Sequence, residues 1–592
     1  MQNAVAFSDN DVITIAWSYG KKPEGCMGFA IYRINNQGKE TTLPSHAVFA
    51  GETIKPGQTT AEFPVQKFYW KDPYARLVAE QTKNNQFRYK IVPLTGSPGN
   101  LEPMTSLPQI LSNQVEISPV ISAGISAYFN RGLISTQRVA RALQGSASKS
   151  KLLPQLKDPN SPLRASLAGN MVEALTGFLA RAESGGEIYA ALYELNDPVL
   201  LPKLMGLGNR LHIILSNSAA KDPQTGVMTD ANQPARDALE PAGCEKFNRI
   251  MPSGHIGHNK FLVYKDDAGK ARAVLFGSTN WTFTGLCAQT NNTVVIEDDD
   301  LAARYLDYWQ QLANDTTSAD GVGKNLQGPN LRGWEKTGGD LKLSGGEAVE
   351  SWFSPNTPKQ RNRNAKSEAC PMDMQQVIKK INGVKRAILF LAFYPGTPSI
   401  ANWIADALLK NKKLFVRGCV TNKNAAGAFY YELKGASPPK AVKGVKTPIS
   451  EDPRVFAAQA FDGRQIPAGW LKEILQAGFA IVHDKIVVID PFDDDCAVIT
   501  GSHNLGYQAS YNNDENLAII SGNKKLAAAY ATHVLDVYDH FSFRYQYNLT
   551  GGQGADPTLK STPDEWLNKY FDASGHPINA QLGFWMSAVA GS

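Results

Sequence analysis

The first 110 residues alternate apolar and polar side chains in short runs, which Gly, Pro and Asn residues separate. Three of these runs, Val12–Trp17, Gly28–Arg33 and Phe87–Val92, have the two-residue period of strands or are rich in β-branched and aromatic residues. This pattern is typical of an all-β module with the size of a β-sandwich. We therefore predict such a module over residues 1–110.

After residue 120, apolar runs of strand length alternate with segments of helical spacing. Glu187–Tyr193 and Leu211–Leu215 are apolar runs of the first kind, whereas residues 526–541 place apolar side chains at helical intervals. This alternation predicts α/β layers, in which helices cover a sheet. We expect the 526–541 helix to pack in the core.

The α/β region repeats itself. His258-Asn-Lys260 matches His483-Asp-Lys485 at an offset of 225, and Gly277-Ser-Thr-Asn280 matches Gly501-Ser-His-Asn504 at an offset of 224. Two independent motifs therefore agree in register to one residue. Apolar runs upstream of the motifs match at a shorter offset, which predicts an insertion of roughly 25 residues in the second half, between 422 and 469.

The residue types in the two motifs suit a phosphodiester. In a His-x-Lys strand both side chains project from the same face, because strand periodicity is two. A histidine with a pKa near 6.5 can act in its neutral and its protonated form. Charges and uncharged donors for the phosphate oxygens are available from Lys260, Lys485, Asn280, Asn504, Ser278 and Ser502.

The paired motifs resemble the phospholipase D superfamily over about residues 120–548. In that family two half-domains meet, and each contributes half of one active site. The second copy is the fuller match, because Asp490 follows Lys485 at the family's spacing. The first copy has Lys265 at the matching position, with Asp266 and Asp267 next to it. The resemblance implies a structural role for Asp490, and we expect one of the two neighbouring aspartates to replace it in the first copy.

The resemblance also implies a two-step mechanism. We assign His258 as the nucleophile that forms a phosphohistidine, and His483 as the general acid and base. Glu515 resembles the family's downstream carboxylate, and we expect Glu515 to fix the tautomer of one histidine. Its counterpart in the first half is Asn291. The predicted catalytic residues are His258, Lys260, Asn280, His483, Lys485 and Asn504, with Ser278, Ser502, Asp490 and Glu515 in support.

No metal and no cofactor is expected, because the lysines replace a divalent ion and neither motif offers a three-ligand cluster. His503, at the variable position of the second Gly-Ser-x-Asn motif, is a candidate for substrate contact. We read Lys265 as a solvated surface charge. The insertion contains aromatic and basic residues that could bind a headgroup or a nucleotide. A solvated loop is the alternative. These residues are Phe429, Tyr430, Tyr431, Lys434, Lys440, Lys443 and Lys446.

The predicted organisation is multidomain. The strands that hold Trp17, Tyr32 and Tyr89 resemble a fibronectin type III domain, which implies a packing or docking module with a possible protein partner. Two pseudo-symmetric α/β half-domains follow it. The predicted boundaries are 1–110 for the sandwich, 120–345 and 346–548 for the two halves, and 549–592 for a tail that packs on the catalytic core through Trp566, Phe571 and Phe584.

Composition narrows the functional classes. With 43% hydrophobic and 19% charged residues the chain has a globular composition, which excludes a wholly disordered or coiled-coil protein. The net charge of +5 is too small to indicate a broad basic surface for binding DNA. The six cysteines form no close pair, so neither a zinc site nor a dense disulfide framework is indicated. The first twenty residues contain Asp9 and Asp11 and lack the basic start of a signal peptide. No apolar run reaches the roughly 18 residues of a transmembrane helix. We therefore expect a cytoplasmic protein or a non-classical export route.

Three functions stay open at this point. The first is a phospholipid phosphodiesterase at a membrane surface, which the fusion of both halves in one chain favours and which would act as a monomer. The second is a nuclease of the same superfamily that cleaves DNA or RNA. The third is a non-catalytic protein that only binds phosphate. Intact copies of both histidines and both lysines argue against the third function.

Overall fold

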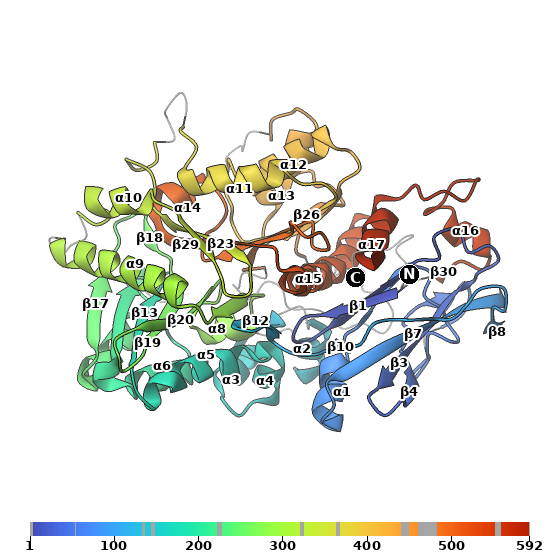
Figure 1. Ribbon diagram of the computed structural model, residues 1–592, viewed down its shortest axis with the longest axis horizontal. Coiled ribbons are helices and arrows are strands. Elements are labelled where there is room, and N and C mark those ends of the chain that lie inside the picture. The colour runs from blue at the N-terminus through green and yellow to red at the C-terminus, as the bar shows by residue number, and fades with distance from the viewer. Residues whose placement is uncertain are drawn as a thin grey trace.

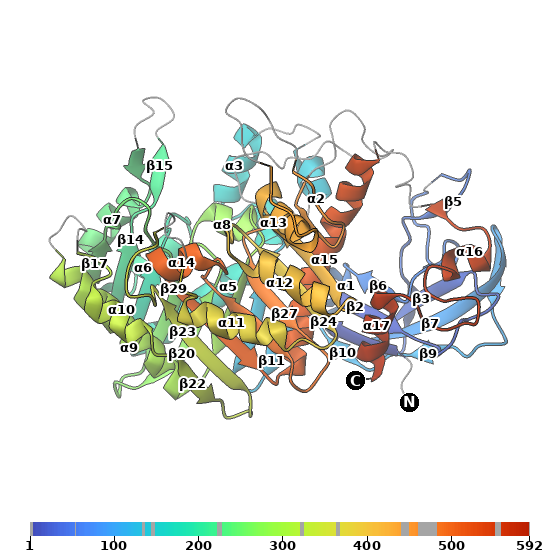
Figure 2. The same cartoon turned by 90° about the horizontal axis from the view of Figure 1, so that it is seen from above.

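The computed structural model describes residues 4–53, 55–132, 136–143, 149–221, 228–319, 325–362, 368–439, 449–459, 482–550 and 558–590. The molecule is elongated, with the N-terminal strands at one end and two large sheets at the other (Figure 1). The same arrangement is visible from above (Figure 2).

The N-terminal region is mostly β-sheet, as predicted. One sheet has the order β1-β2-β6, and a second has the order β10-β7-β3-β4 with β8 and β9 on β7. Trp17, Phe29 and Tyr89 fill the core between the sheets and are fully buried. One helix, α1 (Ala75–Thr82), interrupts the strands. The strands are β1 (Ala4–Ser8), β2 (Ile13–Trp17), β3 (Gly28–Asn35), β4 (Glu40–Thr42), β6 (Tyr69–Asp72), β7 (Gln86–Ser97), β8 (Asn100–Pro103), β9 (Ile110–Leu111) and β10 (Val115–Glu116). The fibronectin type III likeness stays a prediction.

The C-terminal tail packs largely on this module. β30 (Thr558–Leu559) pairs with β5 (Val48–Phe49), and the short helix α16 (Pro563–Leu567) carries Trp566 into the module's core. The Trp566 indole N–H donates to the Cys26 carbonyl at 2.8 Å. Within residues 558–590, the helix α17 (Ala580–Ala590) contacts the catalytic region, where the Phe584 ring stacks on Phe415 at 4.4 Å. The described tail therefore packs on the catalytic core through α17 and on the N-terminal module through β30 and α16.

The two large sheets have the same strand order. The first runs β11-β12-β21-β20-β19-β13-β14-β17 and the second β22-β23-β29-β28-β27-β24-β25-β26, with corresponding pairs parallel or antiparallel alike. The first sheet comprises β11 (Val120–Ser122), β12 (Ile125–Phe129), β13 (Glu187–Leu192), β14 (Leu211–Ser216), β17 (Glu245–Arg249), β19 (Lys260–Lys265), β20 (Ala271–Gly277) and β21 (Asn292–Ile296). The second comprises β22 (Gly339–Lys342), β23 (Ala348–Ser354), β24 (Ala387–Ala392), β25 (Phe415–Val420), β26 (Val455–Ala457), β27 (Lys485–Ile489), β28 (Ala497–Gly501) and β29 (Asn513–Ser521).

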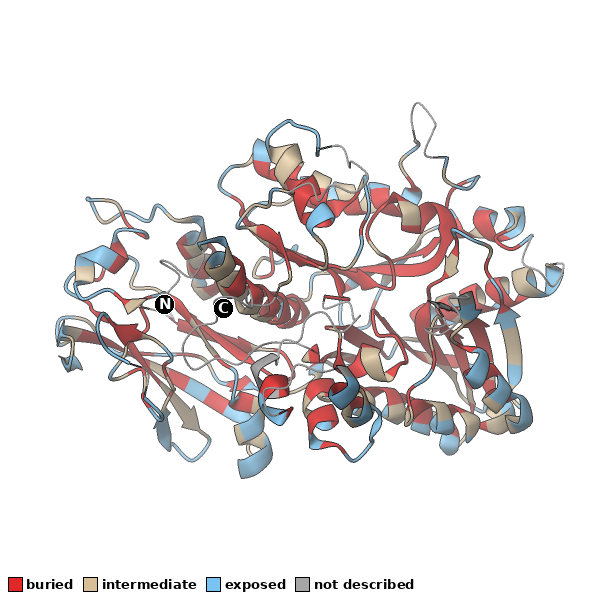
Figure 3. Ribbon diagram, turned by 180° about the vertical axis from the view of Figure 1, so that it is seen from behind, coloured by how far each residue is buried: buried red, intermediate tan, exposed pale blue. Residues whose placement is uncertain are grey.

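Two long helices lie between the sheets. α9 (Asp299–Ser318) and α15 (Lys524–Leu549) share one apolar core with the inner faces of both sheets (Figure 1). Each helix begins at a side-chain cap, Asp298 for α9 and Asn523 for α15, which satisfies a free backbone N–H of the first turn. The helix predicted over 526–541 is thus present, and it continues to residue 549. Buried residues run along the strands of both sheets (Figure 3).

Shorter helices cover the outer faces. The first sheet is covered by α2 (Thr136–Ala142), α3 (Lys149–Lys157), α4 (Pro162–Ala168), α5 (Met171–Ala180), α6 (Leu200–Met205), α7 (Gln233–Leu239) and α8 (Phe283–Cys287). The second is covered by α11 (Met372–Asn382), α12 (Ile400–Lys410), α13 (Lys423–Leu433) and α14 (Tyr507–Asn512). Because both faces of each sheet are covered, the central strands are continuously apolar, as the sequence pattern indicated.

The predicted insertion lies in a longer connection before β27. β19 starts 11 positions after β17 ends, at Arg249 and Lys260, whereas β26 ends at Ala457 and β27 starts only at Lys485. Most of this connection, residues 460–481, lies outside the described residues, as do Lys440, Lys443 and Lys446. Phe429, a candidate for ligand contact, is instead buried in the core beneath α13.

Candidate active site

The two motif histidines lie together. His258 precedes β19 and His483 precedes β27, and their ring centroids are 6.4 Å apart. Both side chains are buried, with 2% and 3% of their surface exposed. The two halves of the repeat therefore meet at the residues that the sequence singled out.

Each histidine is held in place by the opposite half. The His258 backbone N–H donates to the Asp514 carbonyl at 2.9 Å, and the His483 N–H donates to the Thr290 carbonyl at 3.1 Å. In addition, β18 (Ile256–Gly257), just before His258, joins the second sheet as a parallel partner of β29. These crossed backbone bonds fix the two histidines relative to each other.

The ring nitrogens also have crossed partners. His258 Nδ1 lies 2.8 Å from Oε2 of Glu515, and His483 Nδ1 lies 2.8 Å from Oδ1 of Asn291. Both partners are assigned as acceptors, so each Nδ1 donates its proton and each neutral ring keeps a lone pair on Nε2. Glu515 therefore holds the tautomer of His258, and Asn291 does the same for His483.

The motif serines orient these acceptors. Ser502 Oγ donates to Glu515 at 2.7 Å, and Ser278 Oγ donates to Asn291 at 2.9 Å. Because a hydroxyl has one proton to donate, neither serine is a donor for substrate while these bonds exist. The two serines support the histidine partners, which corrects the expectation that they donate to the phosphate.

Burial sets the charge state of the reacting groups. Burial lowers the pKa of His258 to about 4, against the opposing effect of Glu515. Burial and the neighbouring lysines hold the pKa of His483 well below its ordinary value. Burial would raise the pKa of Glu515, but the charge and hydrogen bond of His258 lower it to about 2. The empty site thus holds two neutral imidazoles beside one carboxylate.

The lysines occupy matching positions on the two sides. Lys260 Nζ donates to the His258 carbonyl at 2.6 Å and lies 5.0 Å from the centre of the Tyr193 ring. Lys485 Nζ donates to the His483 carbonyl at 2.5 Å and lies 5.0 Å from the Phe393 ring. Burial lowers the pKa of Lys260 to about 7 and that of Lys485 well below its ordinary range. An anion between these lysines would favour their protonated forms.

The two motif asparagines differ in their contacts. Asn280 Nδ2 donates to Oε2 of Glu194 at 2.6 Å, and the other Glu194 oxygen accepts from Ser218 at 2.8 Å. Oδ1 of Asn280 and Oδ1 of Asn504 are buried without a hydrogen bond among the described residues. Sequence reasoning missed Glu194. The available signal was its position, because Glu194 directly follows the apolar run Glu187–Tyr193 that predicts a strand.

The family model described as "Cardiolipin synthase, PLD-like domain" matches residues 184–313 and 378–536, which include both motif pairs. The chain belongs to the phospholipase D superfamily. It is thus a phosphodiester-acting protein of that superfamily, which leaves the substrate open. No curated protein matches the chain.

Several solved structures resemble this phospholipase D-superfamily chain. Phosphatidylserine synthase from Haemophilus influenzae Rd KW20 is 12% identical, with a TM-score of 0.40, and the match covers 63% of this chain and 85% of that one. Yeast tyrosyl-DNA phosphodiesterase is 9% identical, with a TM-score of 0.31 and coverage of 58% and 84%. The phospholipase D family member Nuc from Salmonella typhimurium is 17% identical, with a TM-score of 0.20 and coverage of 33% and 95%.

The superfamily aspartate has a structural role on both sides. Asp490 accepts hydrogen bonds from the backbone N–H groups of Lys385, Arg386 and Ala387, each at 2.8 Å, where β24 begins. In the first half, Asp267 accepts from the Gly186 N–H at 2.6 Å, just before β13. Asp267 therefore takes the place of the missing aspartate. Lys265, expected to be a solvated charge, is instead partly buried and paired with Glu187 at 2.5 Å.

His503 does not face the other motif residues. Its Nε2 lies 3.0 Å from Ser510 Oγ and 3.2 Å from the Asp373 carboxylate, and its Nδ1 accepts from the Leu505 N–H. The side chain is 1% exposed. The expectation of substrate contact is wrong, because the turn after β28 directs this side chain toward α11 and α14.

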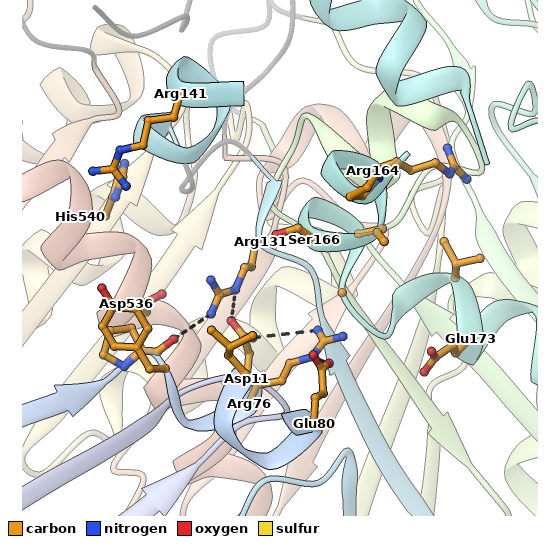
Figure 4. A pocket seen from close by; sticks show the side chains of 18 of the residues that line it. Asp11, Arg76, Glu80, Arg131, Arg141, Arg164, Ser166, Glu173, Asp536 and His540 are labelled. Carbon is orange, nitrogen blue, oxygen red and sulfur yellow. Dashed lines mark hydrogen bonds and ion pairs between the residues drawn. The ribbon is translucent and has the colours of Figure 1, made fainter. Parts of the chain in front are cut away.

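A cavity of about 1110 Å³ lies elsewhere, between the N-terminal module, α4, α5 and α15. None of the predicted site residues lines it. Figure 4 shows Arg131 and Arg76 converging on Asp11 at this junction. A third arginine, Arg164, is buried in an ion pair with Asp197 at 2.8 Å.

Two further findings concern the described part of the chain. Within these residues, no group of three or more His, Cys, Asp or Glu side chains is arranged to hold a metal ion. None of the helices there is both long and apolar enough to cross a membrane.

Proposed function

We propose that the protein is a phosphodiesterase of phospholipase D type, which hydrolyses phospholipids through a phosphohistidine intermediate. The observation that carries this proposal is the pair of buried histidines, each with Nδ1 held by the opposite half and each accompanied by a lysine. One chain supplies both halves of the site, so we expect the monomer to be active.

In the first step, the Nε2 lone pair of His258 attacks phosphorus and forms a P–N bond. His483 enters this step protonated at Nε2, the form that the anionic substrate favours and that the second step regenerates. As the bond from phosphorus to the leaving alcohol breaks, His483 transfers this proton to that alcohol. Phosphorylation makes the His258 ring cationic, and the Glu515 carboxylate at Nδ1 stabilises this charge. The order of the two histidines in the proposal follows from this partner.

His483 suits the role of the acid for the complementary reason. Its Nδ1 partner is the neutral amide of Asn291, and both lysines lower its pKa. A protonated His483 is therefore a strong acid that gives its proton readily to the leaving oxygen. In the second step, neutral His483 takes a proton from water, the water oxygen bonds to phosphorus, and the P–N bond breaks.

The remaining residues bind the phosphate. We assign Lys260 and Lys485 to the non-bridging oxygens, where negative charge accumulates in the transition state. Asn280 and Asn504 supply amide donors next to them. With the anion bound, the lysines are protonated, and their charge offsets that of the phosphate.

The test uses His258→Asn and His483→Asn, with His576→Asn as the matched control because His576 lies exposed in the tail. Phosphatidylcholine or phosphatidylglycerol vesicles are incubated with each protein and chelator, and headgroup release is measured. We expect both active-site variants to lose at least about 10³-fold in turnover, and the control to match the wild type. Near-normal turnover by either active-site variant would refute the scheme.

A second measurement distinguishes the roles of the histidines. A p-nitrophenyl phosphodiester has a leaving group that needs no proton. With this substrate we expect His483→Asn to accumulate phosphorylated protein, and His258→Asn to accumulate none. The reverse pattern would exchange the two assignments.

The nuclease alternative is an outcome of the same assay. Release of headgroup without cleavage of single-stranded DNA supports the lipid substrate, and the opposite result supports a nuclease. A primary alcohol added to the lipid assay should compete with water for the phosphohistidine and give a phosphatidyl alcohol. Binding without turnover of either substrate would indicate a non-catalytic protein.

A further inference from the structure

The middle residue of each His-x-Lys motif contacts the helices between the sheets. In the first motif Asn259 Nδ2 donates to the Tyr308 hydroxyl of α9 at 2.9 Å. In the second motif the Asp484 carboxylate lies 3.2 Å from Nε2 of His533 on α15. Asp484 is fully buried and His533 is 3% exposed. The second motif is therefore anchored to α15 by a buried contact between a histidine and a carboxylate, at the residue directly between His483 and Lys485.

His533 packs on Phe129 of β12, and the N-terminal module contacts the backbone of Phe129. The imidazole stacks on the Phe129 ring, with centroids 4.6 Å apart and planes at 24°. Asn10, in the turn between β1 and β2, bonds both backbone groups of Phe129. The Phe129 N–H donates to Asn10 Oδ1 at 3.0 Å, and Asn10 Nδ2 donates to the Phe129 carbonyl at 3.3 Å. The turn thus places the ring on which His533 stacks.

The other residues of the turn strengthen this contact. Asp9 and Asn10 are both 2% exposed, which is unusual for a polar turn. Burial lowers the pKa of His533, but the Asp484 carboxylate raises it above its ordinary value overall. Asp11 pairs with Arg131, two residues beyond Phe129 (Figure 4). The turn is therefore bound to the catalytic region at Phe129 and again at Arg131.

We propose that the β1–β2 turn, residues 9–11, positions the general acid His483, acting through His533 and Asp484. The N-terminal module is then a part of the catalytic unit. The inference rests on the proposed function, since it uses the assignment of His483 as the acid. It goes beyond that function, because the positioning residues lie outside both sequence motifs.

The experiment compares Asn10→Asp and His533→Phe with two controls. Asn10→Asp keeps the acceptor for the Phe129 N–H and removes the donor, and His533→Phe keeps the ring and removes the bond to Asp484. Lys71→Met is the matched control, because Lys71 of the module also pairs with α15, through Asp536 and Asp539 at 3.0 and 3.1 Å, without touching this chain of contacts. His533→Gln restores a donor and tests for rescue.

The readout is the dependence on the leaving group. A displaced acid slows expulsion of an alkoxide, which needs a proton, more than expulsion of p-nitrophenolate, which does not. For the alkyl diester we expect Asn10→Asp and His533→Phe to lower kcat about 10- to 100-fold with KM unchanged. For the p-nitrophenyl diester we expect the first-turnover burst of p-nitrophenolate to stay near the wild type in both variants, because this substrate forms the phosphohistidine without an acid. Lys71→Met should lower the thermal midpoint and leave both rates unchanged.

Three outcomes would overturn the proposal: equal first-turnover losses on both substrates, the same loss in Lys71→Met, or wild-type rates in His533→Phe. Circular dichroism of each variant checks that it is folded. If Asn10→Asp fails to fold, the pair His533→Phe and His533→Gln decides. Wild-type protein that turns over neither substrate would instead refute the proposed function.

Discussion

The two halves of the active site share one scaffold and differ in the groups that contact the histidines. β19 and β27 present a His-Lys pair in the same way, and each lysine lies over an aromatic ring 5.0 Å away. The Nδ1 partner, however, is the carboxylate of Glu515 for one histidine and the amide of Asn291 for the other. The repeated fold therefore places the two histidines and two lysines in matching positions. Glu515 and Asn291 then give the two histidines different hydrogen-bond partners.

The halves also differ at the strand that neighbours each motif. Glu194 follows β13 and contacts Asn280, whereas Tyr394, at the corresponding place after β24, carries no charge and is 49% exposed. Glu194 raises the pKa of both lysines against the effect of burial. The first half thus has a carboxylate at this position, beside Asn280, where the second half has an uncharged ring.

The largest loss of turnover should come from replacing the residues that accept hydrogen bonds from Nδ1 of the two histidines. Glu515→Gln removes the charge that stabilises a phosphorylated His258, and we expect turnover to fall on the order of 10²- to 10⁴-fold. Asn291→Ala removes a neutral bond and should cost on the order of 10-fold. Rates with a p-nitrophenyl diester measure both effects, with the surface variant Glu187→Gln as control. Equal losses in the two active-site variants would contradict the division of roles.

Substitution of either lysine should reduce activity by a similar factor, in contrast to substitution of the two histidine partners. Lys260→Met and Lys485→Met each remove one positive charge from the non-bridging oxygens, so we expect similar losses in kcat/KM, on the order of 10²-fold. Steady-state rates on the same diester provide the comparison. A loss confined to one lysine would mean that the phosphate lies on one side of the site.

Proton uptake on binding an anion sharpens the comparison further. The pKa of Lys260 is lowered to about 7, so at pH 8 most of the empty protein carries neutral Lys260. A bound anion raises this pKa, and we expect Lys260 to contribute up to about one proton of uptake at pH 8 and less at pH 6. Calorimetry with tungstate in buffers of different ionisation enthalpy measures the uptake. Lys260→Met should reduce it, and unchanged uptake in that variant would exclude Lys260 as the source.

The smallest expected effects concern the structural aspartates. Asp490 accepts three backbone N–H bonds, and Asp267 has one such bond to Gly186. Asp490→Ala should therefore lower the thermal midpoint more than Asp267→Ala, since an unsatisfied buried donor costs about 1–3 kcal/mol. Activity per folded molecule should be unchanged in both. A larger shift for Asp267→Ala would show that the two aspartates are not equivalent anchors.

Much of the site could be predicted because its residues repeat in register. The offsets of 225 and 224 identified His258, His483 and the two lysines without any structure. The replacement of the missing aspartate was also expected, and Asp267 provides it. His503 was predicted wrongly, since a side chain at a strand end can turn either way and only packing against α11 and α14 decides.

Contacts that cross between the halves could not be read from the sequence. Glu515 was expected to orient one histidine, and its partner proves to be His258, 257 residues away. The same holds for Asn10 and Phe129, which are separated by 119 residues. No local pattern encodes such distances.

By itself, the sequence determined the strand runs, the duplicated motifs and the four groups that can act on a phosphodiester, because these depend on residue type and local periodicity. The tertiary structure alone decided which acceptor faces which histidine, that the serines donate to those acceptors, and that the N-terminal turn binds Phe129. The reason is that a hydrogen bond forms only at about 3 Å. Such distances arise when two sheets pack on one shared layer of helices, and they are a property of the assembled fold.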